Sequence, residues 1–224
     1  MIGKVAALCD LARKRQETRW PGYKCIGDYF DGAYECDHVS PYTKAANNVD
    51  ANVFILLQDW SSDQALGRSL DSDARDFGYT RSDPTNIRLE RLLGTHFQLS
   101  LDRTYTTNLF PFVKMGNMSA RIAVADLTRA ANEFAVPQVE IVRPRLVICL
   151  GLSTYNALRR ARGCRLVRSV SDAGETRFDI GGAEVWCQAH TGALGQINRN
   201  RGGIDRVSPD WERMARSFSG RLQH

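Results

Sequence analysis

Three side chains suited to acid–base and hydrogen-bond chemistry follow apolar segments of this sequence. The run FILLQ is followed by Asp59, TYTT by Asn108, and EVWCQA by His190. A carboxylate can orient an attacking water, an imidazole can donate to a developing anion, and a carboxamide offers one donor and one acceptor. Each residue taken singly is also explained by turn formation or capping, so the interpretation depends on whether they meet.

The segments that carry these residues are predicted to be strands of one parallel sheet. The predicted strands are residues 53–58, 104–108, 146–150 and 185–189. VFILLQ and LVICL are continuously apolar, as expected of strands that are covered on both faces. Helical patterns occupy residues 3–19, 85–93, 119–142 with a break at Pro137, 153–161 and 209–222. This alternation predicts the α/β class, as a three-layer α/β/α sandwich around a central, mainly parallel four-stranded sheet.

The 224 residues are expected to form one domain. Residues 1–50 comprise the predicted N-terminal helix and an irregular extension, whose part from 20 to 50 is predicted to be a surface loop, and residues 51–218 form the core. No internal repeat or low-complexity linker divides the chain. No apolar run is long enough for a membrane span and the N-terminus becomes charged too early for a signal peptide, so a cytoplasmic protein is expected.

The charge balance favours a polyanionic partner without proving one. The chain has 30 lysines and arginines against 25 acidic residues, a net charge of +5. Arginines concentrate in NALRRARGCRLVR and GQINRNRGGIDR, which could contact nucleic acid. A solvated basic face is the alternative interpretation.

The six cysteines give little indication of a cofactor. No C-x-x-C pair is present, and Cys149 and Cys187 lie in apolar runs where buried thiols are expected. A zinc or iron–sulfur site would need several ligands at suitable spacing, and Cys25, Cys36 and His38 are close enough in sequence to leave a metal as the alternative. We expect no metal and no cofactor.

The carboxyl ends of the predicted strands should gather on one rim, where ligands of parallel sheets bind. Asp59, Asn108 and His190 would meet there, together with the helix that begins after Gly151. Ser153 and Thr154 open that helix, so they can cap it or direct its amides at a phosphate.

Four short motifs in this order resemble those of the uracil-DNA glycosylase superfamily. QDWSS resembles its GQDPYH water-activating motif, and TNLFPF resembles its strand-two asparagine motif. EIVRPRLVICLGLSTYNAL is similar to its segment of an acidic residue, a proline, an apolar strand and an LG-helix, and HTGALGQINRNRG to its HPSPLS segment. The resemblance covers residues 50–218, and no P-loop, nicotinamide fingerprint or HExxH motif competes with it.

The resemblance implies a DNA glycosylase that flips out and excises a pyrimidine. Asp59 would orient the water and stabilise an oxocarbenium-like sugar, and His190 would donate to the pyrimidine O2. Asn108 would bind the Watson–Crick edge, and its amide matches uracil in one orientation and cytosine in the other. Leu194 would fill the gap in the base stack, unless it only packs within its loop.

Other residues take roles by the same resemblance. Base contacts are expected from Gln58, Trp60, Ser61, Phe77 and Asn108. DNA contacts are expected from Ser153, Thr154, Leu194, Arg199 and Arg201. Tyr79 is the alternative to Phe77 as the aromatic that stacks on the base, followed by Phe110 and Phe112.

The sequence also departs from the family. The iron–sulfur cysteines of some branches and the KRRIH-type insertion of the cross-linking branch are absent. Ser61 stands where the uracil-specific branch has a tyrosine against C5, which leaves room for a 5-substituent. A hydroxymethylated or glucosylated pyrimidine of phage DNA, and hence an antiviral defence role, is one expectation. Uracil is the other, if Trp60 or Tyr79 fills the space.

Two other functions remain open at this stage, a non-catalytic nucleic-acid-binding protein and a nucleoside or nucleotide hydrolase. DNA is the expected partner and no membrane is expected. A monomer is the default expectation, since the sequence is silent on oligomeric state. No lysine falls at a motif position for a Schiff-base lyase step, so a monofunctional enzyme is expected, although Lys114 is near enough to leave that step open.

Overall fold

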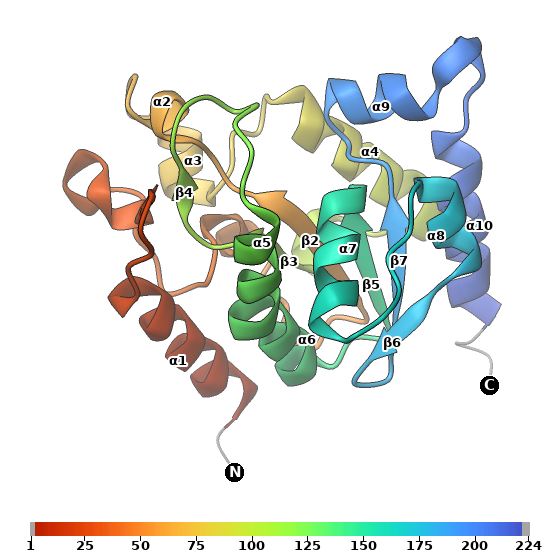
Figure 1. The fold of residues 1–224 in the computed structure, drawn as a ribbon, viewed down its shortest axis with the longest axis horizontal. Coiled ribbons are helices and arrows are strands. Elements are labelled where there is room, and N and C mark those ends of the chain that lie inside the picture. The colour runs from red at the N-terminus through yellow and green to blue at the C-terminus, as the bar shows by residue number, and fades with distance from the viewer. Residues whose placement is uncertain (1–2, 221–224) are drawn as a thin grey trace.

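The computed structural model describes residues 3–220, which form an α/β fold around a mainly parallel five-stranded sheet flanked by helices (Figure 1). The strands are β2 (Val53–Asp59), β3 (Tyr105–Phe110), β5 (Leu146–Leu150), β6 (Phe178–Ile180) and β7 (Ala183–Gln188). Their order is β3-β2-β5-β7-β6, and only β6 runs antiparallel to its neighbour. The four predicted parallel strands are confirmed.

The predicted count of four strands is wrong, because the sequence analysis missed β6. This strand has three residues and pairs with β7 through a hairpin that turns at Gly181-Gly182. A Gly-Gly pair between short apolar segments is a hairpin signal, so the sequence did contain a sign of this strand.

Helices cover both faces of the sheet because the strand side chains alternate between two apolar clusters. Phe54 and Leu56 pack on one side, and Val53, Ile55 and Leu57 pack on the other. The first cluster is shared with α1 (Lys4–Glu17), α5 (Val124–Ala130), α6 (Val136–Val142), α7 (Leu152–Ala161) and α8 (Val170–Glu175). The second is shared with α4 (Pro84–Phe97) and α10 (Val207–Gly220). Shorter helices are α2 (Asp63–Leu66), α3 (Ser72–Phe77) and α9 (Ala193–Arg199).

The predicted helix over residues 119–142 begins later and is not broken at Pro137. It runs from Val124 to Val142 as α5, a π-helical turn over Ala131–Ala135, and α6. A proline inside a regular α-helix lacks an N–H and collides with the preceding turn. The wider π-helical turn, which ends at Ala135 before Val136-Pro137 continues the helix as α6, accommodates the proline.

Residues 20–50 were predicted to be a surface loop, and this prediction is wrong. Trp20, Tyr34 and Tyr42 are buried, and β1 (Tyr23–Lys24) pairs antiparallel with β4 (Val113–Lys114). Three short 3₁₀ helices complete the segment, at Ile26–Asp28, Phe30–Gly32 and Pro41–Ala45. Aromatic residues at irregular spacing bury this segment against the core without forming a periodic pattern.

The buried Arg15 attaches this segment to α1. Its guanidinium pairs with the Glu35 carboxylate and donates to the carbonyls of Cys36 and His38, at 2.8 Å each. A guanidinium that satisfies three acceptors in a buried position holds a chain without regular secondary structure in one conformation.

The described residues include no helix that is both long enough and apolar enough to cross a membrane. Cys149 and Cys187 are buried free thiols, as predicted. Burial raises the pKa of both, to about 12 for Cys187, so neither has a reactive thiolate near neutral pH.

Candidate active site

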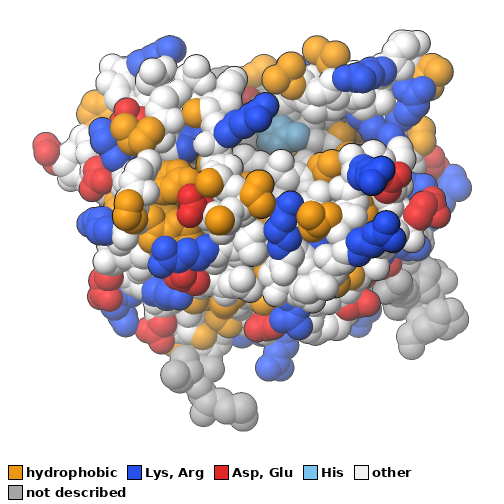
Figure 2. All heavy atoms as spheres, viewed as in Figure 1, with side chains coloured by type: hydrophobic (Ala, Val, Ile, Leu, Met, Phe, Trp, Pro, Cys, Tyr) orange, Lys and Arg blue, Asp and Glu red, His pale blue; other side chains and the backbone are white. Residues whose placement is uncertain are grey.

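A cavity of about 1050 Å³ lies at the carboxyl ends of the parallel strands. Asp59 at the end of β2, Asn108 on β3, Gly151 after β5 and His190 after β7 all line it. The fold therefore brings the carboxylate, the amide, the start of α7 and the imidazole to one cavity, as predicted. In Figure 2 a histidine side chain is visible in a hollow of the surface, with Lys and Arg side chains near its margin.

Asp59 is a buried carboxylate with a partner on each oxygen. Oδ1 accepts a hydrogen bond from Gln58 Nε2 at 2.9 Å, and Oδ2 lies 2.8 Å from Lys114 Nζ. The side chains of Asp59 and Lys114 are only 8% and 5% exposed. A carboxylate held at both oxygens on a central strand keeps one orientation, as a water-positioning group requires.

Lys114 lines the cavity, and the sequence analysis named it only as the residue that leaves a Schiff-base step open. It ends β4 and is bridged by backbone pairing to Tyr23 on one side and Ser62 on the other. Besides contacting Asp59, its Nζ donates to the carbonyl of Met118 at 2.6 Å. The amine is thus fixed inside the cavity beside the carboxylate.

Asn108 lines the cavity and carries a buried, unpaired donor. Its Oδ1 accepts a hydrogen bond from Ser40 Oγ at 2.6 Å, whereas its buried Nδ2 has no partner among the described residues. A buried donor without an acceptor costs about 1–3 kcal/mol, so a ligand that supplies the acceptor recovers that free energy. Ser40 lies in the segment 20–50, and nothing in the sequence linked it to Asn108.

His190 is held in one tautomer by the backbone. The Gly192 N–H donates to its Nδ1 at 2.9 Å, so in the neutral imidazole the proton is on Nε2. Burial lowers the pKa of His190 and Lys114 lowers it further, while Asp59 and Asp83 act in the opposite direction. The imidazole is therefore a neutral hydrogen-bond donor at physiological pH.

The start of α9 depends on a glycine beside His190. A Cβ on Gly195 would lie 2.2 Å from the His190 carbonyl oxygen and 2.9 Å from the His190 Cβ. No side chain fits there without moving α9, so Gly195 sets how closely this helix approaches the imidazole.

The aromatic residues around the cavity differ in part from those expected. Trp60 lines it and donates from Nε1 to the Gly78 carbonyl at 2.8 Å. Tyr42 and Tyr79 also line it and stack on one another, with ring centroids 4.9 Å apart. Tyr34 completes the set, with its ring edge on Trp60 at 5.4 Å.

Phe77 is not brought to the cavity, contrary to its expected role in binding the base. It is the last residue of α3, is 39% exposed, and its ring stacks under the guanidinium of Arg81 at 4.1 Å. Phe110 and Phe112 are buried in the core around Trp20. Of the stacking candidates only Tyr79 lines the cavity, and spacing along a loop did not distinguish it from Phe77.

Ser61 lines the cavity as expected and is nearly buried, at 8% exposure. The cavity lining is mixed, with apolar residues such as Ala65, Leu66 and Ala74 and a set of polar residues. The polar set includes Ser69, Asp71, Thr80, Asp83, Asn86 and Ser119. The cavity that Ser61 lines therefore offers hydrogen-bonding groups as well as apolar surface.

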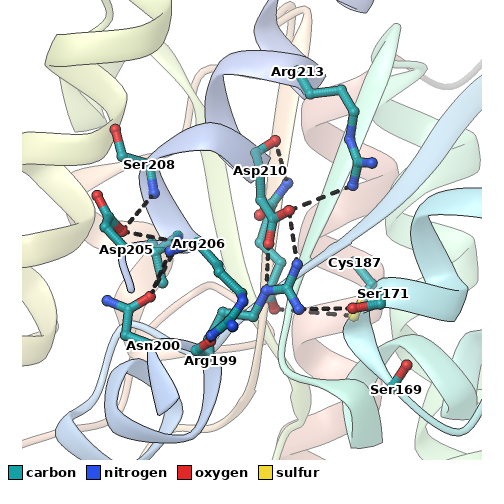
Figure 3. A network of polar contacts seen from close by, with 12 residues as sticks. Ser169, Ser171, Cys187, Arg199, Asn200, Asp205, Arg206, Ser208, Asp210 and Arg213 are labelled. Carbon is teal, nitrogen blue, oxygen red and sulfur yellow. Dashed lines mark hydrogen bonds and ion pairs between the residues drawn. The ribbon is translucent and has the colours of Figure 1, made fainter. Parts of the chain in front are cut away.

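Two residues of the expected DNA-contacting set are engaged elsewhere. Thr154 is fully buried and donates to the carbonyl of Leu150, the last residue of β5, at 3.3 Å, so its hydroxyl faces the fold and not the surface. Arg199 chelates Asp210 at 2.6 and 2.9 Å and donates to Ser171 at 2.7 Å (Figure 3). This guanidinium joins α9 to α8 and α10. The arginine-rich sequence alone did not show that Arg199 has this structural role.

The other expected DNA contacts lie at the mouth of the cavity or on the adjoining surface. Ser153 lines the cavity and is exposed, and Leu194 on the first turn of α9 lines it with 73% exposure. Arg201 is exposed and donates to Asn198 at 3.2 Å. Arg160 lines the cavity and was not singled out from sequence, although it lies within the arginine cluster.

Across residues 3–220 no group of three or more His, Cys, Asp or Glu side chains is placed to hold a metal ion. Cys25, Cys36 and His38 form no such group. No protein-family model matches the chain, and no curated protein matches its sequence. The chemistry must therefore be judged from the cavity itself, which combines a buried carboxylate, an amine, a neutral imidazole and a free amide donor.

Proposed function

We propose that this chain is a DNA glycosylase with the three-layer sandwich of the uracil-DNA glycosylase superfamily. It flips a pyrimidine out of DNA and hydrolyses the N-glycosidic bond, leaving an abasic site. The observation that carries the proposal is the unpaired Nδ2 donor of Asn108, which shares one cavity with Asp59 and His190. This arrangement suits a base that offers a hydrogen-bond acceptor to Nδ2 and whose N-glycosidic bond lies between Asp59 and His190.

Asn108 selects the base by its hydrogen bonds. With Ser40 donating to Oδ1, the free Nδ2–H matches a C4 carbonyl, as in uracil and its 5-substituted forms. With the amide turned over and Ser40 as acceptor, the free oxygen would match the 4-amino group of cytosine. The base panel described below distinguishes the two.

Asp59 and His190 act on opposite sides of the breaking bond. Asp59 orients the water and stabilises positive charge on the sugar, as carboxylates do in glycoside hydrolysis. The neutral His190 donates from Nε2 to the pyrimidine O2, where negative charge develops as the base departs. Removal of one such donor typically costs about 3 kcal/mol of transition-state stabilisation.

The cavity leaves room for a base larger than uracil. Its volume of about 1050 Å³ is several times that of a pyrimidine and lies at the top of the usual range for ligand pockets. Ser61 and the polar residues of the cavity lining could accept a hydroxymethyl or glycosyl group on C5. Excision of such bases from phage DNA would make this a defence enzyme.

Base release from a defined panel tests the proposal. The panel contains uracil, thymine, 5-hydroxymethyluracil, 5-hydroxymethylcytosine and glucosylated 5-hydroxymethylcytosine, in single-stranded and duplex DNA, with abasic sites detected by alkaline cleavage. We expect release of at least one 5-substituted base, and a loss of about 10²–10⁴-fold in rate for Asp59→Asn. The control is Asp102→Asn, an exposed residue on a 3₁₀ turn before β3.

Three outcomes would contradict the proposal. Release of no base would leave a non-catalytic nucleic-acid-binding protein. Equal rates for Asp59→Asn and the wild type would remove the water-positioning role. Hydrolysis of free nucleosides, with Leu194→Ala unchanged, would point to a nucleoside hydrolase.

A further inference from the structure

Lysine is rare in this chain, and its placement in the cavity is distinctive. Only five of the 30 basic residues are lysines, and Lys114 is the only one after residue 44. Lys4, Lys14 and Lys24 have side chains that are 36–46% exposed, whereas that of Lys114 is 5% exposed. A guanidinium would pair with Asp59 equally well but remains charged, whereas an amine can lose its proton and become a nucleophile.

The geometry gives the Lys114 amine both a proton acceptor and a fixed position. Asp59 Oδ2 is 2.8 Å from Nζ, and the carbonyl of Met118, in the loop that follows Lys114, is 2.6 Å from Nζ. In the proposed reaction Asp59 lies beside the sugar, so the amine of Lys114 also lies beside C1′. After the base has left, C1′ of the ring-opened sugar is an aldehyde, which is the electrophile that amines attack.

We propose that Lys114 carries out a second reaction at this site, cleaving the DNA strand at the abasic product through an imine. The inference rests on the proposed glycosylase function for the placement of the sugar. It makes the protein bifunctional, which the sequence analysis did not expect.

The steps balance without an oxidant or a further co-reactant. Nζ passes a proton to Asp59, its lone pair forms a bond to C1′, and the aldehyde oxygen leaves as water. The C1′=N imine makes a hydrogen on C2′ acidic, and Asp59 in its carboxylate form or a water removes it. The electron pair forms the C2′=C3′ bond and expels the 3′ phosphate. Hydrolysis of the imine with one water then returns the free lysine.

The alternative role for Lys114 is that of a counter-ion that only neutralises Asp59. Lys114→Arg separates the two roles, because arginine keeps the charge and the pairing but cannot form the imine. Lys24→Arg is the matched control, since Lys24 lies on β1 beside β4 and pairs with Asp63 at 2.8 Å.

The experiment uses the full chain and DNA that already contains an abasic site, so that it does not depend on base excision. Incubation with borohydride reduces any imine to a stable protein–DNA adduct, and peptide mass spectrometry locates the attachment. We expect the wild type to form an adduct on Lys114 and, without borohydride, to cleave the strand. The Lys24→Arg variant should do both. The Lys114→Arg variant should form no adduct and cleave no strand. Mapping in the wild type identifies the residue even if the variant does not fold.

Absence of an adduct, or an adduct mapped to another amine, would overturn the inference. A protein that releases bases but traps no abasic DNA would refute only the lyase step. A protein that traps abasic DNA on Lys114 yet releases no base from the panel would refute only the glycosylase function.

Discussion

At the scale of single residues, the amide of Asn108 has its orientation set by one hydroxyl. Ser40 Oγ is fully buried and donates to Oδ1 at 2.6 Å, which leaves Nδ2 for the ligand. For Ser40→Ala we expect kcat/KM on the preferred base to fall about tenfold, because the amide then turns freely between its two orientations. We also expect the free energy of unfolding to fall by about 1–3 kcal/mol, since Oδ1 loses its donor.

Single-turnover kinetics on two bases and denaturant unfolding check this prediction. The control is Ser119→Ala, which removes another hydroxyl of the cavity lining, one on an exposed residue. If Ser40→Ala retained the wild-type rate and the wild-type discrimination between 4-carbonyl and 4-amino pyrimidines, Ser40 would not orient the amide.

The protonation of His190 gives a second prediction at this scale. Burial lowers the pKa of His190 below its usual 6.5, so the neutral form persists to lower pH. Protonation would place an N–H at Nδ1 against the Gly192 N–H, breaking the hydrogen bond that orients the ring. We expect the rate of base release to stay constant as pH falls through 6.5 and to decline only below it.

The same shift affects stability with a definite sign. The unfolded chain takes up this proton near pH 6.5 and the folded chain only at lower pH, so the free energy of unfolding falls below pH 6.5. In the His190→Asn variant, the remaining rate of base release should no longer decline below pH 6.5, which is the acid limb of the pH profile. His96→Gln is the control, because burial lowers the pKa of His96 as well, but it lies against Ser208 and Trp211, away from the cavity. An acid limb that persists in His190→Asn would assign it to another group.

At the scale of elements, the two halves of the site differ in how far the sequence predicts them. Asp59, Asn108 and His190 follow apolar runs, and the sheet must bring the carboxyl ends of its parallel strands together. Ser40, Tyr34 and Tyr42 come from residues 20–50, where no periodic pattern exists. Their positions depend on tertiary contacts, which no local pattern encodes.

The close approach of α9 to His190 predicts that a shift of this helix impairs base release. Gly195→Ala places a Cβ 2.2 Å from the His190 carbonyl oxygen, so α9 must shift and carry Leu194 with it. We expect base release to fall at least tenfold with only a modest loss of stability, because α9 has no fully buried residue. Kinetics on duplex DNA and thermal unfolding measure the two effects.

Gly94→Ala is the matched control, since Gly94 is exposed in the last turn of α4 and a Cβ there meets nothing within 4 Å. This substitution should raise the free energy of unfolding by about 0.5–1 kcal/mol and leave activity unchanged. Wild-type activity in Gly195→Ala would show that α9 tolerates the shift and that its approach to His190 is not critical.

At the scale of the whole molecule, the excess of arginine does not map simply onto a DNA-binding surface. Arg159 and Arg199 lie in the two arginine clusters, but both guanidinia are engaged within the fold. Arg160 lines the cavity and Arg201 is exposed, so these remain able to reach a phosphate. The sequence predicted where basic residues concentrate, but it could not show which guanidinia are already paired, because their carboxylate and carbonyl partners are remote in the chain.

The salt dependence of DNA binding tests how many phosphates the whole molecule contacts. Each phosphate contact contributes about −0.9 to the slope of log K against log salt, so three to five contacts would give a slope of about −2.7 to −4.5. We expect Arg201→Ala to make the slope less steep by about one, equally for all DNA sequences. Arg103→Ala should leave it unchanged, because this exposed residue precedes β3, at the edge of the sheet opposite the cavity. Titrations use the Asp59→Asn protein as background, so that the DNA is not turned over. A flat salt response, or equal slopes with and without Arg201→Ala, would show that phosphate contacts at the mouth of the cavity do not carry the affinity.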